Sequence, residues 1–305
     1  MKIVVSGSTG LIGSALIDAL RGRRRDHEIV PLVRRPVSSG EHAIAWDPER
    51  GAIDRAGLEG TDAVIHLAGE NVFGRWSAAK KQRIYDSRVK GTRLVSDALA
   101  GLHRPPATLL AASAIGYYGD RGDEPVTEAS TPGEDFLAHV ARDWEAATAA
   151  ATRAGIRVVN MRMGVVLTTT GGALAKMLPA FRLGLGGPVG SGNQYLSWIA
   201  LADVLNAILH LLERPDLVGP VNMTAPAPIT NREFVRALGK VLGRPAVVTV
   251  PAFALRIAFG TDGAAMLQSG QRVMPARLLA SGFNFGSPDV EHALRFLLAP
   301  SESGR

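Results

Sequence analysis

A glycine-rich loop immediately after the first apolar run is the feature that most constrains the fold of this chain. The loop follows Ile3–Val5 and reads Gly7-Ser8-Thr9-Gly10-Leu11-Ile12-Gly13. Glycines at these positions permit a tight turn, a close approach of the backbone to a pyrophosphate, and close packing of a helix on a strand. Free amides at the start of the following helix bind the phosphate charge. The pattern predicts a strand–loop–helix unit that binds a dinucleotide, with an ordinary glycine turn as the alternative.

Short apolar runs alternate with helix-length segments over the first part of the chain. The later runs are Ile29–Val33, Ala63–Leu67, Thr108–Ala112 and Arg157–Arg162. Strands separated by helices pair in parallel through right-handed crossovers, and continuously apolar strands are typical of a sheet that is covered on both faces. We therefore predict an α/β fold with a doubly wound, Rossmann-type parallel sheet.

The chain is long enough for a second unit beside this sheet. It has 305 residues, of which 46% are hydrophobic, and this suits a large α/β domain with a smaller partner. We predict a cofactor-binding domain over 1–170, to which later segments return, and a smaller, mainly helical C-terminal substrate lobe over 171–305 that includes a domain over 250–298. Within the lobe, Gly184–Gly192 predicts a loop, Leu201 the start of a helix, and Thr230 with Glu233 a capping box.

Several classes of protein are excluded by what the sequence lacks. It contains no cysteine, which excludes disulfide frameworks, thiolate metal sites and a cysteine nucleophile. It has no HExxH spacing, no metal-ligand set, no Walker motif and no Gly-x-Ser-x-Gly with triad context. We see no signal peptide and no apolar run near the ~20 residues that span a bilayer, so we expect a cytoplasmic protein without a membrane partner. His66, inside an apolar run, is interpreted as a core residue rather than a ligand.

Two arginines follow the second apolar run. The sequence there is Leu32-Val33-Arg34-Arg35-Pro36, whereas an NAD-specific protein usually has an acid at this place for the ribose hydroxyls. Guanidinium groups suit a 2′-phosphate instead. Arg34 and Arg35 thus favour NADP(H) over NAD(H), with the alternative that one or both are merely solvated.

Six further motifs are spread over nearly the whole chain. They are LAGENV (67–72), SRVKGT (87–92), GYYG (116–119), FRLGLGGPVGSGNQ (181–194), SWIALADV (197–204) and GQRVMPARLLASGF (270–283). With the glycine loop they resemble the extended short-chain dehydrogenase/reductase superfamily, and more closely an atypical branch of it, the NAD(P)-dependent epimerase/dehydratase family with a C-terminal domain of unknown function. The resemblance implies cofactor contacts at Leu67, Ala68, Gly69, Glu70, Arg162 and Val166.

The acid–base pair of that superfamily is absent. Relatives use Tyr-x-x-x-Lys on a helix, where residues four apart share a face and the ammonium lowers the pKa of the phenol. Counting back from Glu145 places Leu137 and Ala141 at those two positions. The resemblance also leaves the position of the catalytic serine open between Ser113 and Ala114.

Candidates for substitute chemistry follow the run Thr108–Ala112. They are Ser113, Tyr117 and Tyr118, and Ser113 is also expected to contact the cofactor. Glu70 and Asn71, at the end of the run Ala63–Leu67, are further candidates. In an extended segment adjacent side chains point to opposite sides. Only one of the two tyrosines is therefore expected to face the site, while the other packs.

Arg88 stands where relatives have an asparagine that helps to position the catalytic lysine. A helical wheel places Arg88 inside an apolar stripe formed by Ile84, Gly91, Val95, Ala98, Leu99 and Leu102. A guanidinium in such a stripe needs an anion, because an unpaired buried charge is costly. We predict that Arg88 reaches the phosphate or ribose region of the cofactor, with an ion pair to a neighbouring carboxylate as the alternative.

Polar and aromatic residues flank the glycine-rich loop at 184–192. They are Lys176, Asn193, Gln194, Tyr195 and Trp198, and they are interpreted either as a substrate rim or as ordinary loop polarity and core aromatics. Asp203 matches a recurrent acidic position of extended relatives, although a helix-start or structural hydrogen bond explains it equally well.

These observations favour an NADP(H)-dependent oxidoreductase or epimerase-like enzyme that acts on an unknown small polar substrate. The alternative is a noncatalytic NADPH-binding sensor or regulatory protein, which the loss of the tyrosine–lysine pair motivates. The formal charge of +6 would also suit nucleic-acid binding, but Arg34, Arg35 and Arg88 account for half of it, and no nucleic-acid partner is expected. The expected partner is a small-molecule substrate, and a homodimer is the assembly left open.

Overall fold

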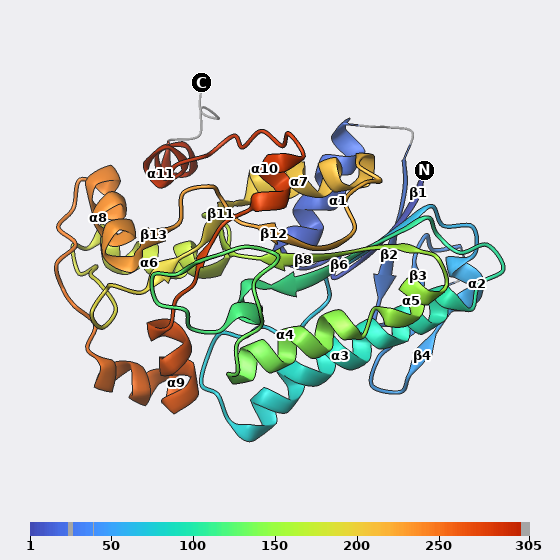
Figure 1. Cartoon of the computed structure of the whole chain (residues 1–305), viewed down its shortest axis with the longest axis horizontal. Coiled ribbons are helices and arrows are strands. Elements are labelled where there is room, and N and C mark those ends of the chain that lie inside the picture. Colours follow the sequence, from blue (N-terminus) through green and yellow to red (C-terminus); the bar gives the residue numbers. More distant parts are fainter. Residues whose placement is uncertain (24–26, 39, 300–305) are drawn as a thin grey trace.

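The computed structural model describes residues 1–23, 27–38 and 40–299, and its centre is a sheet of eight strands (Figure 1). The strands are β1 (Lys2–Ser6), β2 (Glu28–Val33), β3 (Ile44–Asp47), β4 (Ala52–Ile53), β5 (Ala63–His66), β6 (Thr108–Ala114), β8 (Arg157–Met163) and β12 (Gly219–Met223). They lie in the order β12-β8-β6-β5-β1-β2-β3-β4. All neighbours run parallel except β3 and β4, which form an antiparallel edge. The predicted Rossmann-type sheet is confirmed, and it gains β3, β4 and β12.

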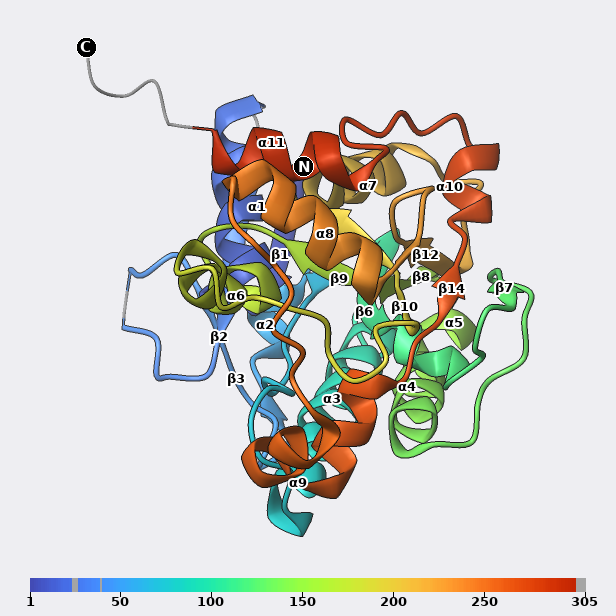
Figure 2. The ribbon, with the colours of Figure 1, turned by 90° about the vertical axis from the view of Figure 1, so that its left-hand side faces the viewer.

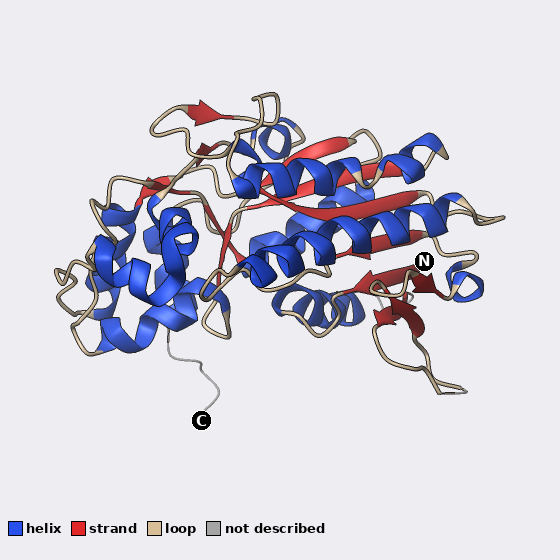
Figure 3. Cartoon of the chain, turned by 90° about the horizontal axis from the view of Figure 1, so that it is seen from below, coloured by secondary structure: helices blue, strands red, loops and turns tan. Residues whose placement is uncertain are grey.

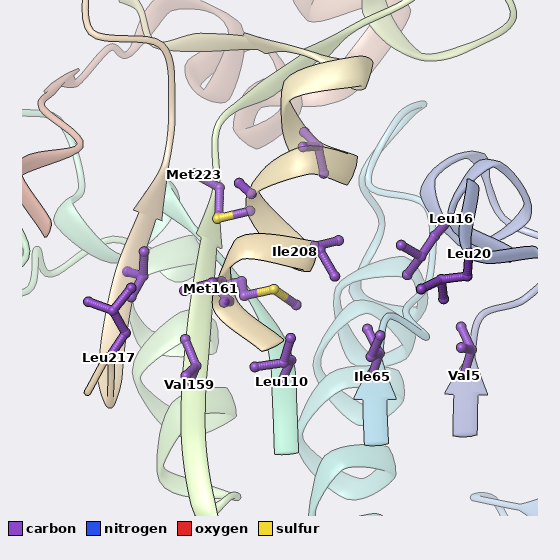
Figure 4. Packing of buried hydrophobic residues seen from close by; sticks show 14 of the residues in the cluster. Val5, Leu16, Leu20, Ile65, Leu110, Val159, Met161, Ile208, Leu217 and Met223 are labelled. Atoms are coloured by element: carbon purple, nitrogen blue, oxygen red, sulfur yellow. The ribbon is translucent and has the colours of Figure 1, made fainter. Parts of the chain in front are cut away.

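The sheet is covered on both faces because successive side chains along its strands are apolar. In β1 and β5, Val4 and Val64 belong to one cluster of buried residues, whereas Val5 and Ile65 belong to another. Figure 4 shows the second cluster, where side chains from β1, β5, β6 and β8 meet those of the helices that cover this face. Such burial on both faces is what continuously apolar strands require.

Helices form one layer on each face of the sheet (Figures 1 and 3). One layer contains α1 (Leu11–Arg23) and α7 (Leu201–Glu213), and the other contains α3 (Ala78–Ala100), α4 (Phe136–Ala146) and α5 (Ala149–Arg153), while α2 (Arg55–Leu58) is a short connection. The apolar stripe predicted on α3 is buried, and it comprises Ile84, Gly91, Val95, Ala98, Leu99 and, just beyond the helix, Leu102. No helix in the described ranges is both long and apolar enough to cross a membrane.

The C-terminal lobe is mainly helical and lies at one end of the sheet (Figure 2). Its helices are α6 (Gly172–Arg182), α8 (Asn231–Leu242), α9 (Ala252–Gln268) and α11 (Val290–Leu298), whereas α10 (Ala276–Ala280) packs beside β12 on the face of the sheet that α1 and α7 cover. Three pairs of short strands connect it to the sheet domain or brace it: β9 (Val165–Leu167) with β11 (Trp198–Ala200), β10 (Tyr195–Leu196) with β13 (Ile229–Thr230), and β7 (Pro125–Val126) with β14 (Arg272–Val273). The core of the lobe joins α6, α8 and α11.

Local signals in the lobe are confirmed. Residues 184–192 form a loop, α7 begins at Leu201, Thr230 caps α8 through a reciprocal pair of bonds with Glu233, and Gly243 ends that helix with a φ of 62°. Because α7 and β12 return to the sheet domain, the two predicted units are not consecutive in the chain. The boundary at residue 170 stays a prediction, and residues 300–305 at the end of the predicted lobe lie outside the described ranges.

Asp203 ties the last part of the chain to the sheet domain. Its carboxylate lies in the first turn of α7, and the residue is 1% exposed. It accepts hydrogen bonds from the amides of Gly286 and Ser287 at 2.8 and 2.9 Å. Between the two interpretations of this acid, the structure therefore favours the structural hydrogen bond.

Candidate functional site

A cavity lies where the order of the strands reverses. The chain passes from β1 outward to β2 and later returns to β5 on the other side of β1. In doubly wound sheets, ligands bind at the carboxyl ends of the strands where the strand order reverses in this way. The cavity has a volume of about 450 Å³. Residues of the predicted cofactor set that line it are Gly7, Ser8, Thr9, Gly10, Arg34, Arg35, Leu67, Ala68, Gly69 and Glu70. Leu32, Val33, Trp46, Pro48 and Ser87 also line it.

The floor of the cavity depends on close packing between glycines. Gly7 has a φ of 66°, and its carbonyl oxygen accepts a hydrogen bond from the amide of Gly10 at 2.9 Å. A Cβ atom on Gly13 would lie 2.2 Å from the carbonyl oxygen of Gly7, so only glycine fits there. The helix thus begins at Leu11 directly against the loop, and its first amides have no partner within the helix. This cradle fits a pyrophosphate, with Leu11, Ile12 and Gly13 behind the lining.

The two arginines after β2 differ in their partners. Arg35 donates two hydrogen bonds to the carboxylate of Glu41, and these bonds lower the pKa of Glu41 to about 2. Arg34 is exposed and has neither a hydrogen-bond acceptor nor an ion-pair partner in the part of the chain that the structure describes. Both arginines line the cavity. Arg34 is therefore free to bind an anion there, whereas Arg35 is already paired.

Arg88 lies behind the wall of the cavity. Its Nη1 donates to the carbonyl oxygens of Glu70 at 3.0 Å and Ile84 at 3.3 Å, and its guanidinium carbon lies 5.0 Å from the ring centre of Trp144. Burial lowers the pKa of Arg88 to about 10, although the charge of Glu70 opposes this. A Cβ on Gly69, which lines the cavity, would lie 3.5 Å from the guanidinium carbon. Within the described ranges no carboxylate forms an ion pair with Arg88, so that alternative is wrong there, while its contact with a cofactor stays a prediction.

Glu70 lines the cavity, and its charge is already paired. Its carboxylate accepts a hydrogen bond from Nζ of Lys80 at 2.7 Å, and this bond holds the pKa of Glu70 below its usual range. Its amide donates to Oγ of Ser87 at 2.9 Å. The loop after β5 is thereby fixed against the start of α3.

His66 lies beneath the cavity as a core residue, as predicted. Oγ of Ser6 accepts the amide hydrogens of Leu67 at 3.0 Å and Ala68 at 3.2 Å, which leaves the hydroxyl proton for Nδ1 of His66 at 2.8 Å. Nδ1 is then the acceptor and Nε2 carries the proton. Nε2 is buried without a hydrogen-bond partner among the described residues, and the ring meets that of Trp46 edge-on at 5.7 Å. Through Ser6, His66 holds two residues of the cavity wall.

Acidification is expected to destabilise the protein through His66. Its complete burial lowers the pKa of the imidazole to about 4, whereas an unfolded histidine titrates near ~6.5. Between these two pKa values the unfolded state binds a proton that the folded state does not. The free energy of unfolding therefore decreases as the pH is lowered from ~6.5 to about 4, by about 3 kcal/mol in total. Urea unfolding at a series of pH values across the window measures the loss.

Two variants test whether His66 causes this loss of stability. In His66→Gln most of the pH-dependent loss should disappear, because the buried titrating group is gone. In His103→Gln, which removes an exposed histidine, the loss should remain. A His66→Gln protein that loses stability as steeply as the wild type would show that another group is responsible.

A buried charged network lies at the carboxyl ends of β6 and β8. Arg162 of β8 donates two hydrogen bonds to the carboxylate of Glu145 on α4, at 2.7 and 2.8 Å. Ser113 of β6 donates to the same carboxylate at 2.7 Å. Burial alone would lower the pKa of Arg162, but the hydrogen bonds and charge of Glu145 raise it above its usual value. The guanidinium stays charged, and the carboxylate that it holds fixes the hydroxyl of Ser113.

Tyr117 and Tyr118 both contact this guanidinium. They lie in a 3₁₀ turn, η1 (Ile115–Tyr118), so the alternation expected of an extended segment does not apply. The guanidinium carbon of Arg162 lies 3.5 Å from the ring centre of Tyr117 and 5.1 Å from that of Tyr118. Tyr118 is fully buried, accepts from Arg162 at 2.9 Å and donates to Asn222 at 2.7 Å, and burial raises its pKa to about 12. Tyr118 therefore packs, which leaves Ser113 and Tyr117 as the candidates for chemistry.

Residues near the glycine-rich loop separate into surface and core positions. Nζ of Lys176 on α6 lies 3.2 Å from the ring centre of Phe73, which meets Phe259 of α9 edge-on. Trp198 is fully buried in the core of the lobe. Val166 of β9 is half-buried against the core of the sheet domain and does not line the cavity. The described ranges hold no group of three or more acidic, histidine or cysteine side chains that is suited to a metal ion.

Sequence patterns did not indicate Glu145, Asn222 or Trp46 as site residues. A signal for Glu145 existed, because Arg162 inside an apolar run requires a carboxylate, and the helix Phe136–Ala146 carries one. No local signal indicated Trp46. It reaches the cavity only because β3 pairs with β2.

Known proteins are similar to this chain in both sequence and fold. The sequence profile of the NAD dependent epimerase/dehydratase family matches residues 3–223. The chain belongs to this family. A second profile, a domain of unknown function (DUF1731), matches residues 250–297 of this family member. Both matches confirm the resemblance that the motifs indicated.

Relatives of this family member are similar to it over almost the whole of its own length. An epimerase family protein from Mycobacterium bovis is 44% identical over 295 residues, which cover 96% of each chain. The crystal structure of human epimerase family protein SDR39U1 (isoform 2) with NADPH has a TM-score of 0.89 and 36% identity, and covers 97% of this chain and 99% of that chain. A nucleoside-diphosphate sugar epimerase from Corynebacterium glutamicum has a TM-score of 0.77 and 35% identity, and covers 97% of this chain and 58% of that chain.

Proposed function

We propose that this family member binds NADP(H) between β1 and β5 and acts as an oxidoreductase or epimerase-like enzyme on a small polar substrate. The observation that carries the proposal is that the glycine cradle and the unpaired Arg34 line one cavity. The cradle would hold the pyrophosphate, and Arg34 would hold the 2′-phosphate. The human relative whose structure contains NADPH supports this choice of cofactor.

The substrate end of the site lies toward β6 and β8, because Arg34 lies on the β2 side of the glycine loop. There a bound nicotinamide would supply or accept a hydride. Ser113 donates a hydrogen bond to Glu145. The lone pairs of its oxygen therefore remain to accept a hydrogen bond from a substrate hydroxyl. Arg162 holds Glu145 in place, and Tyr117 covers Arg162. These residues orient a substrate oxygen in the absence of the tyrosine–lysine pair.

The alternative of a noncatalytic NADPH sensor rests on α4. Leu137 and Ala141 replace the acid–base pair, and Ala141 is only 2% exposed. Incubation of the purified protein with NADPH and a panel of carbonyl compounds and sugar nucleotides separates the two functions, with NADPH absorbance as the readout. We expect NADPH binding and turnover of at least one compound. Binding without any turnover would favour the sensor, and an absence of binding would contradict both.

Arg34→Ala is expected to weaken NADPH binding by about ten- to hundredfold, because a hydrogen bond to a charged group is worth about 1.5–3 kcal/mol. NADH, which lacks the 2′-phosphate, should bind within about twofold of wild type, since no such bond is lost. Fluorescence titration of both nucleotides measures the ratio. Arg153→Ala, at an exposed position on α5, is the control and should change neither affinity. An equal loss for both nucleotides would place Arg34 away from the 2′-phosphate.

A further inference from the structure

Arg272 is a partly buried arginine without an acceptor. It lies in β14, is half-buried, and its Nε is fully buried with no hydrogen-bond partner among the described residues. The ring of Tyr195 faces it, with 5.4 Å between the guanidinium carbon and the ring centre. No carboxylate or carbonyl group in the described ranges binds its guanidinium. A charge in this position is costly unless an anion completes it.

Within the described ranges, the other partly buried arginines are satisfied. Arg162 binds Glu145, and Arg157 donates to the carbonyl oxygens of Arg214, Leu217 and Leu211. Arg88 donates to two carbonyl oxygens. The contrast indicates that the partner of Arg272 is not part of the chain described by the structure.

The segment that carries Arg272 joins the two elements at the substrate end of the site. Val273 packs against Ile115 and Tyr118 of η1. Ser197 donates to the carbonyl of Gln271 and accepts from the amide of Val273, and its own carbonyl accepts from the amide at the start of β9. Successive side chains of a strand point to opposite sides, so Arg272 points away from the core contact that Val273 makes.

Arg272 also lies far along the sheet from the phosphate end of the cofactor cavity. Arg34 follows β2, whereas η1 and β9 follow β6 and β8, on the other side of β1 and β5. An anion at Arg272 would therefore belong to the substrate rather than to the cofactor. A guanidinium recognises carboxylate and phosphate through paired N–H groups.

We propose that Arg272, supported by the ring of Tyr195, anchors an anionic group of the substrate, a carboxylate or a phosphate. This inference rests on the proposed function, and it narrows the substrate class to small anionic molecules. Tyr195 supplies a π face that holds the guanidinium without neutralising it. The N–H groups of Arg272 stay available to the substrate.

Anion binding to the NADPH-loaded protein tests the proposal. Calorimetric titrations with sodium phosphate and, separately, sodium malonate report binding in the absence of turnover. We expect saturable one-to-one binding of at least one anion, weakened about tenfold or more by Arg272→Gln. Binding of phosphate alone would indicate a phosphorylated substrate, and binding of malonate alone would indicate a substrate with a carboxylate. Binding of both anions would indicate a site that recognises either group. No saturable binding to wild type, or equal binding to Arg272→Gln, would overturn the proposal.

Matched variants separate recognition from structure. Tyr195→Phe keeps the ring and should bind within about twofold of wild type, whereas Tyr195→Leu should bind several-fold more weakly. Arg236→Gln, at an exposed position on α8, should be unchanged. Without added anion, Arg272→Gln should melt at or above the wild-type temperature, because an uncompensated charge has been removed. A lower melting temperature would assign Arg272 a structural role and would contradict the proposal.

Failure of this inference can be distinguished from failure of the proposed function. Arg272→Gln should bind NADPH as tightly as wild type does, because Arg272 lies outside the cofactor cavity. If wild type fails to bind NADPH, the proposed function fails. The anion titration is then repeated in Arg34→Ala, which removes the competing phosphate site, and its result decides the role of Arg272 alone.

Discussion

Glu145→Ala is expected to lower the free energy of unfolding by about 3–5 kcal/mol. The substitution leaves the guanidinium of Arg162, whose side chain is 3% exposed, without its carboxylate. It also removes the acceptor of the Ser113 hydroxyl. Urea unfolding measures the change, and turnover should fall with it because the substrate oxygen loses its oriented partner.

Two further proteins test the cause of that loss. Glu124→Ala breaks an exposed ion pair with Arg121, and it should cost less than ~1 kcal/mol. The double variant Arg162→Met, Glu145→Leu removes both charges, and it should recover most of the stability while remaining inactive. A Glu145→Ala protein as stable as Glu124→Ala would mean that Arg162 is not held by Glu145.

Gly13→Ala is expected to weaken NADPH binding by about ten- to hundredfold, the equivalent of one or two charge-assisted hydrogen bonds. The new Cβ would lie 2.2 Å from the carbonyl oxygen of Gly7, so the loop must move away from the start of α1. Overpacking of this kind also costs about 1–3 kcal/mol of stability. Fluorescence titration of NADPH and urea unfolding give the two numbers.

Gly22→Ala is the matched control on the same helix. A Cβ at Gly22 meets no atom within 4 Å, and alanine favours a helix over glycine by up to about 1 kcal/mol. NADPH affinity should be unchanged, and stability should be equal or slightly higher. If Gly13→Ala binds NADPH as tightly as Gly22→Ala, close packing behind the loop is not what positions the cofactor.

Strand prediction from the sequence worked where burial on both faces left a continuous apolar run, as in β5, whose four residues are all fully buried. It failed for β12, which begins with Gly219 and Pro220, residues that predict a turn. β12 tolerates them because it is the edge strand of the sheet, where a proline without an amide hydrogen leaves no ladder bond unmade.

The cofactor end of the site was predictable because its chemistry is local. A loop and a helix start lie within seven consecutive residues, Gly7–Gly13, directly after the end of β1 at Ser6, and the geometry of glycine restricts the conformations that they can adopt. The choice between Arg34 and Arg35 was not predictable. It depends on whether Glu41 folds back onto one of them.

The sequence by itself determined a doubly wound sheet and a glycine loop before its first helix, and it predicted the loss of the tyrosine–lysine pair, because each follows from local backbone constraints or from residue identity at a motif. Only the tertiary structure decided which side chains meet at the carboxyl ends of β6 and β8. Glu145 meets Ser113 across 32 positions, and Tyr118 meets Asn222 across 104. Buried charges and hydroxyls take whichever partner packing brings within hydrogen-bond distance, and residue order along the chain does not specify that partner.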